Sequence, residues 1–169
     1  GTTRKTQATA SCKNSSASRK FLSKAAPVNS EPLVNLHRIG QLDQVPFSEE
    51  LFRKMLAVAQ NRIQDAQRPE NSAETRFDCA YTAIRATADA ALLRFGYRTS
   101  TSKPGHHQTT IQCLAHTLAV DAATVRTLDA LRKQRNLSDY DGEHITDSLL
   151  KECLDQAQAL VALAEKTWV

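Results

Sequence analysis

The sequence contains few of the residues that break helices or build turns. Its 169 residues include only five Gly and five Pro, and aromatic residues make up 5% of the chain. This scarcity argues against a turn-rich β-sandwich, a collagen-like repeat and a Gly-based phosphate-binding loop. No window approaches the ~20 successive apolar residues that a membrane-spanning helix needs. The composition therefore favours a helical, Ala-rich protein that is not in a membrane.

Cysteine is also scarce and widely spaced. The four cysteines are Cys12, Cys79, Cys113 and Cys153. They include no Cys-x-x-Cys pair, and the neighbouring His106, His107 and His116 fit no established zinc pattern around Cys113. We therefore expect free thiols in a reducing, cytoplasmic setting, with no metal and no cofactor.

Acidic residues are absent from the first 30 positions. Six Lys and Arg residues precede Glu31, the first acid, and the remainder holds 16 basic and 18 acidic residues. The net charge of +4 therefore belongs to a tail, and the remainder shows no electrostatic signature of duplex binding. The tail also lacks the apolar core of a secretory signal. We expect a basic, disordered or extended tail at 1–32, a connecting arm at 33–46 and a helical domain at 47–169.

Helix-breaking residues divide this helical domain into four uninterrupted windows. The windows are 47–68, 70–95, 106–141 and 143–169. In each window apolar residues recur at steps of three and four, which predicts one buried helical face. Ser48 and Thr146 are expected N-caps, and Gly96 suits the left-handed position after a helix end. Four such faces joined by short connections predict an all-α fold, an antiparallel four-helix bundle.

The third window departs from this pattern near its middle. A core position there holds Asp121, which is a poor core residue and a good cap, so we expect a kink or break at this point. Many residues on the four apolar faces are Ala, which bury little area each. We therefore expect a homodimer that buries further apolar surface.

The connection between the third and fourth windows carries the strongest candidate for chemistry. It reads Arg135-Asn136-Leu137-Ser138-Asp139-Tyr140-Asp141-Gly142. A guanidinium stays charged and binds paired phosphate oxygens, so Arg135 is a candidate anion ligand. A purely structural alternative is a basic helix end followed by an ordinary turn. On that alternative Arg135 forms an ionic clasp with Asp139, Asp141 or Glu74.

Several further features occur together with this connection. They are the four-helix order, Arg76 and Tyr81 in the second window, and Gly-His-His at 105–107. In these features residues 47–169 resemble the HEPN superfamily of small helical-bundle proteins. HEPN ribonucleases carry an Arg, a neighbouring polar residue, four to six variable positions and a His. Arg135 and Asn136 match the first two parts, and Tyr140 stands where the shortest spacing would place the His.

The resemblance implies roles for these residues. Arg135 would hold the scissile phosphate, Asn136 would orient the site, and no metal would be required. A phenol with a reference pKa near ~10 is a poor base at neutral pH, so Tyr140 argues against cleavage unless His144 supplies the base. The candidate catalytic set is therefore Arg135, Asn136, Tyr140 and His144. The candidate binding residues are Arg76, Arg132, Asp139 and Asp141.

These roles favour a binding module for RNA, a nucleotide or a partner protein. The resemblance implies a toxin-antitoxin or defence context, with a nucleotidyltransferase or an antitoxin as partner. One alternative is a metal-independent endoribonuclease that uses the Arg135-Asn136 motif, and another is a structural helical adaptor.

Two geometric expectations follow from the predicted bundle. Arg76 should lie near the Arg135 connection and pair with Asp139, Asp141 or Tyr140. His106 and His107 begin the third window, about 29 residues before Arg135, which is ~40 Å along a continuous helix. The two motifs are therefore expected to be too far apart to form one site in a single chain.

Overall fold

The computed structural model describes residues 31–141 and 144–169, without the side chains of 139–141. The described chain is mostly helical, so the all-α prediction is confirmed in its coarse form. The helices are α2 (Glu31–Arg38), α3 (Glu49–Gln67), α4 (Ala73–Arg94), α5 (His106–Gln112), α6 (Leu114–Thr117), α7 (Ala122–Asp141) and α8 (Asp147–Trp168). The strands are β1 (Leu42–Gln44) and β2 (Tyr97–Thr99), which the sequence did not predict.

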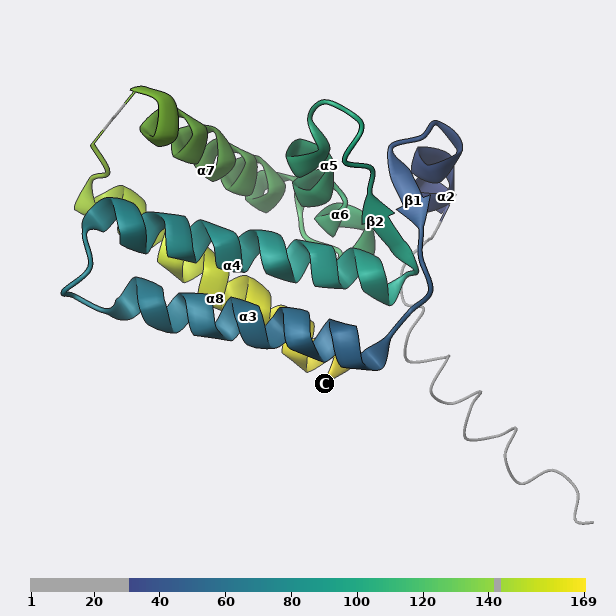
Figure 1. The fold of residues 1–169 in the computed structure, drawn as a ribbon, viewed down its shortest axis with the longest axis horizontal. Coiled ribbons are helices and arrows are strands. Elements are labelled where there is room, and N and C mark those ends of the chain that lie inside the picture. The colour runs from purple at the N-terminus through teal and green to yellow at the C-terminus, as the bar shows by residue number, and fades with distance from the viewer. Residues whose placement is uncertain (1–30, 142–143) are drawn as a thin grey trace, which may run out of the picture.

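Helix α4 is the centre of the fold. It contacts α3 and α8 as well as α5, α6 and α7 (Figure 1). Side chains on most sides of α4 are buried, and many of them are small. Its buried alanines are Ala80, Ala83, Ala88, Ala90 and Ala91. Small side chains let neighbouring helices approach closely, so α4 can be surrounded by other helices.

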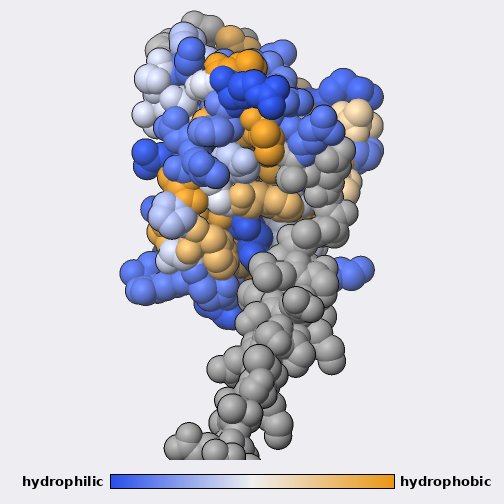
Figure 2. Space-filling model, turned by 90° about the vertical axis from the view of Figure 1, so that its right-hand side faces the viewer, coloured by the Kyte–Doolittle hydropathy of each residue, from blue (hydrophilic) through white to orange (hydrophobic). Residues whose placement is uncertain are grey.

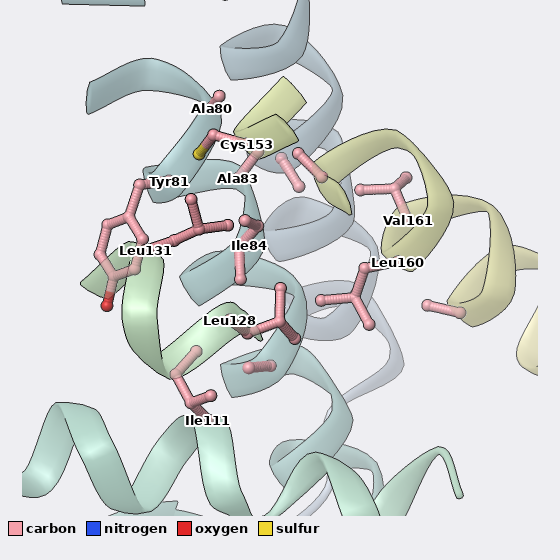
Figure 3. Close-up of a cluster of buried hydrophobic side chains, with 14 of the residues drawn as sticks. Ala80, Tyr81, Ala83, Ile84, Ile111, Leu128, Leu131, Cys153, Leu160 and Val161 are labelled. Carbon is pink, nitrogen blue, oxygen red and sulfur yellow. The ribbon is translucent and has the colours of Figure 1, made fainter. Parts of the chain in front are cut away.

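Larger side chains fill the remaining space around α4. Tyr81 and Ile84 of α4 lie beside Leu128 and Leu131 of α7 in a buried cluster (Figure 3). Leu160 and Val161 of α8 belong to the same cluster. The apolar faces expected from the sequence are thus buried against one another. None of the helices in the described ranges combines the length and apolar character that crossing a membrane requires.

The helix ends follow local sequence signals. The Ser48 Oγ accepts a hydrogen bond from the Leu51 backbone N–H at 3.2 Å, and Thr146 caps α8 in the same way. Gly96 has a φ of 82°, which confirms the left-handed position expected there. Ser72 caps α4 by accepting a hydrogen bond from the Thr75 backbone N–H.

The predicted break near Asp121 is confirmed. The third window forms three helices, and residues 118–121 between α6 and α7 are not helical. Ala119 within this break has a φ of 53°, an unusual value for a residue with a Cβ. The chain reverses here, so that α7 packs against α5 as well as α4.

The segment 33–46, expected to be a connecting arm, contains regular secondary structure. It holds most of α2, which begins at Glu31 within the expected tail, and all of β1; β1 pairs antiparallel with β2, placing Leu42 opposite Thr99. A second small core forms under this sheet. Its buried members are Leu33, Leu42, Leu92, Tyr97 and Cys113. Strands of three residues are too short to give a periodic sequence signal, which explains why they were missed.

The buried cysteines agree with the expectation of free thiols. Cys79, Cys113 and Cys153 are all buried and unpaired, and burial raises the pKa of each. Cys12 lies outside the described residues. Inert thiols of this kind act as small core residues.

Candidate anion site between helices α4, α5 and α7

Arg135 is held on α7 by two residues of α4. Its Nε donates a hydrogen bond to the Asp78 Oδ1 at 2.7 Å, and its guanidinium carbon lies 5.3 Å from the centre of the Tyr81 ring. The side chain of Arg135 remains 27% exposed. A clasp to Asp139, Asp141 or Glu74 was expected; the structure places Asp78 against Arg135, and the side chains of Asp139 and Asp141 lie outside the described residues. Asp78 and Tyr81 are three positions apart on α4, so they lie on the same face of that helix. The sequence alone does not show that α7 packs against this face.

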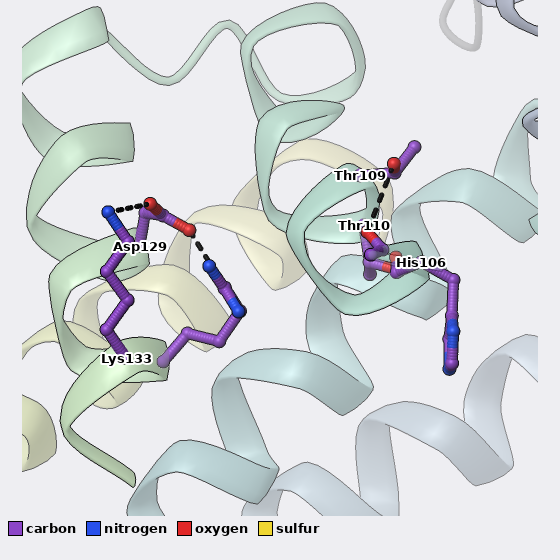
Figure 4. A network of polar contacts seen from close by, with 7 residues as sticks. His106, Thr109, Thr110, Asp129 and Lys133 are labelled. Carbon is purple, nitrogen blue, oxygen red and sulfur yellow. Dashed lines mark hydrogen bonds and ion pairs between the residues drawn. The ribbon is translucent and has the colours of Figure 1, made fainter. Parts of the chain in front are cut away.

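Two further cations of α7 share one carboxylate. The Arg132 Nε lies 2.9 Å from the Asp129 Oδ1, and the Lys133 Nζ lies 3.4 Å from the Asp129 Oδ2 (Figure 4). The ion pair with Asp129 fixes the position of the Arg132 head group. The side chain is 15% exposed, which places it close to the protein surface. The predicted binding residue Arg132 therefore lies on the same helix as Arg135 with a defined orientation.

Helix α4 contributes a third arginine. Arg85 lies one turn after Tyr81, and it makes no hydrogen bond or ion pair with the described residues. Asp89, the next acid along α4, is largely buried, and burial raises its pKa to about 6 against opposing effects of Arg85, Thr110 and His106. Arg85 was not singled out from the sequence, because nothing local marks it as facing another helix.

The start of α5 lies within the electrostatic reach of these arginines. The rings of His106 and His107 have centroids 4.1 Å apart. Burial lowers the pKa of His107, and the positive charges of His106, Arg85, Arg135 and Arg132 act in the same direction, so that together they bring it to about 4. His107 is therefore neutral at pH 7 and stands in the combined field of cations from α4 and α7.

This neighbourhood corrects the expectation that the two motifs are ~40 Å apart. That estimate assumed one continuous helix from His107 to Arg135. The helix that holds His107 instead ends at Gln112, the short α6 ends at Thr117, and α7 packs against α5 and α4. Arg135 consequently acts electrostatically on His107 within one chain.

Other predicted site residues have separate partners. The Arg76 Nε donates to the Ala66 backbone carbonyl at 2.7 Å, which satisfies a carbonyl in the last turn of α3. The His144 Nδ1 lies 3.3 Å from the Glu74 Oε1, and Asn136 is exposed. The side chains of Asp139, Tyr140 and Asp141, which were the expected partners of Arg76, lie outside the described residues.

The Tyr81 hydroxyl is a further polar group at this site. It is buried and has no hydrogen-bond partner within the ranges that the structure describes. Burial raises the pKa of Tyr81, so the phenol stays protonated at neutral pH. A buried hydroxyl of this kind is usually paired with a water or a ligand oxygen.

The site does not have the composition of a metal centre. Within the described residues, no group of three or more His, Cys, Asp and Glu side chains is arranged to hold a metal ion. The cations around His107 would repel one. No family model matches the chain, and no curated protein matches it.

Proposed function

We propose that α3, α4, α7 and α8 form a HEPN-like antiparallel four-helix bundle that binds a phosphate group of RNA or a nucleotide. The observation that carries this proposal is the packing of α5 and α7 against α4 and against each other, which brings the start of α5 within reach of arginines on α4 and α7. The positive field at His107 supports it. Three arginines from two helices contribute to it, together with His106. A phosphate is the biological anion whose paired oxygens match a guanidinium best.

Preorganisation of the arginines supports the same conclusion. Asp78 and Tyr81 fix Arg135, and Asp129 fixes Arg132, so little side-chain entropy remains to be lost on binding. Arg85 adds a cation whose charge is not offset by an ion pair with a described residue. A phosphate placed between α4, α5 and α7 would face all of these groups.

A metal-independent endoribonuclease is the second candidate, and one observation favours it. His107 is neutral at pH 7 and is therefore able to accept a proton. Its pKa of about 4 makes it a weak base, so binding without rapid cleavage is the better-supported function. Roles for Asn136, Tyr140 and His144 in cleavage stay predictions.

The biological setting is also part of the proposal. The resemblance to HEPN proteins favours a homodimer, a toxin-antitoxin or defence context, and a nucleotidyltransferase or antitoxin partner. The structural-adaptor alternative differs from the proposed binding module because an adaptor requires no anion at Arg135.

Binding of a 5′-phosphorylated single-stranded RNA tests the proposal. Arg135→Ala and Arg85→Ala are each expected to weaken binding about tenfold, since a charged hydrogen bond contributes about 1.5–3 kcal/mol. Fluorescence anisotropy at several salt concentrations measures this, and each variant should also reduce the salt slope by about one.

Arg53→Ala is the matched control. Arg53 is an exposed arginine of α3 that pairs with Glu49, and its removal changes the net charge equally. Equal weakening by Arg53→Ala, or no weakening by Arg135→Ala, would contradict the proposed site. RNA cleavage by the wild type that disappears in Arg135→Ala would instead identify a ribonuclease.

A further inference from the structure

A second candidate site lies between α3, α4 and the β1–β2 sheet. It is a cavity of about 530 Å³ that opens to the surface, within the size range of small-molecule sites. Its apolar walls are Val45, Pro46, Leu51, Met55, Leu93 and Tyr97. Leu51 remains 48% exposed, which is a high value for a large apolar side chain. Apolar side chains also gather among polar ones on the end of the molecule that carries the sheet (Figure 2).

One carboxylate lines this apolar cavity. Asp89 of α4 lines it, and the cations that act on Asp89, Arg85 of α4 and His106 of α5, are not among the lining residues of the cavity. These cations and the hydrogen bond from Thr110 do not offset the cost of burying the carboxylate, because the pKa of Asp89 still rises to about 6. A cation entering the cavity would supply the compensation that Asp89 lacks.

Among the described residues, the cation that lines the cavity is Arg98 of β2, and its side chain points toward another carboxylate. Its side chain is 70% exposed, and its Nε lies 3.8 Å from the Asp43 Oδ2. A solvated arginine that faces its own carboxylate attracts an anionic ligand weakly. The charge balance inside the cavity therefore favours a positively charged ligand.

We propose that this cavity binds an amphiphilic organic amine, with its ammonium group on Asp89 and its apolar part against Leu51, Met55 and Leu93. The lining combines mostly apolar walls with one carboxylate, and a few placed polar groups are what orient a ligand in small-molecule sites. This inference does not depend on the phosphate site at Arg135.

The test compares three probes that share one alkyl chain. We expect n-octylamine to bind the full chain at pH 7.5 about tenfold more tightly than 1-octanol, and octanoate to bind most weakly. Backbone amide shifts in NMR titrations report both the affinity and the place of binding. Equal affinity for amine and alcohol, tighter binding of octanoate, or no shifts at α3, α4 and β2 would each overturn the proposal.

Variants separate the head-group contact from the apolar one. Asp89→Asn should remove the tenfold preference for the amine and leave octanol binding unchanged, whereas Asp155→Asn on α8 should leave both unchanged. Met55→Trp should fill the cavity and abolish binding of all three probes. A preference for the amine that survives Asp89→Asn would contradict the assigned contact even if the cavity still binds.

Discussion

Asp89→Asn is expected to stabilise the protein at pH 7 by about 3 kcal/mol, because it removes a poorly compensated buried charge. Burial raises the pKa of Asp89 from 3.8 to about 6. At pH 7 the carboxylate is ionised in both the folded and unfolded states. Only in the folded state is the charge largely removed from water, and this desolvation destabilises the folded state. Asparagine keeps the shape of the side chain and can still accept a hydrogen bond from Thr110.

The effect should disappear as the pH falls. Between about pH 6 and pH 4 the folded state protonates Asp89 before the unfolded state does, so the wild type regains stability relative to the variant. His107 acts in the opposite direction over a similar range, since its pKa is lowered to about 4. Because both proteins contain His107, its contribution cancels in the comparison.

Urea denaturation at pH 7 and pH 4 measures this prediction. Asp155→Asn, which changes an exposed carboxylate of α8 that pairs with Lys151, is the control and should change stability little. A loss of stability in Asp89→Asn at pH 7 would show that Thr110 and Arg85 compensate the charge fully.

Ile84→Ala is expected to destabilise the protein by about 2–5 kcal/mol, through lost burial and the cavity left behind. Ile84 has no exposed surface and lies at the middle of α4, between α7 and α8 (Figure 3). Its neighbours on α4 are mainly small, so few side chains can move to fill the space.

Ile63→Ala removes the same atoms from a partly buried position on α3 and should cost clearly less. Chemical denaturation of both variants and the wild type measures the loss in the free energy of unfolding. Equal losses would contradict the central position of α4 in the core.

The features predicted correctly from the sequence are those set by short-range rules. Ser48 and Thr146 cap helices through hydrogen bonds to residues three positions on, and Gly96 adopts a conformation that its missing side chain permits. The break near Asp121 likewise follows from one polar residue in an apolar row. Each of these signals is complete within a single helical turn or two.

The features that were missed depend on contacts between distant segments. Asp78 lies 57 positions from Arg135, and no pattern near either residue marks the pair. His107 and Arg135 come together because the chain reverses after Thr117. A predicted break does not by itself give the angle between the helices on its two sides. The sheet joins two three-residue strands that are far apart in sequence. Tertiary packing decides all three.

The proposed function requires one anion site formed jointly by α5 and the arginines of α4 and α7. The most direct test follows the pH titration of the His107 ring by NMR, with and without inorganic phosphate. Bound phosphate should offset the field of Arg85, Arg132 and Arg135 and raise the pKa of His107 from about 4 toward the usual range for histidine. A His107 titration that saturating phosphate leaves unchanged would contradict the shared site.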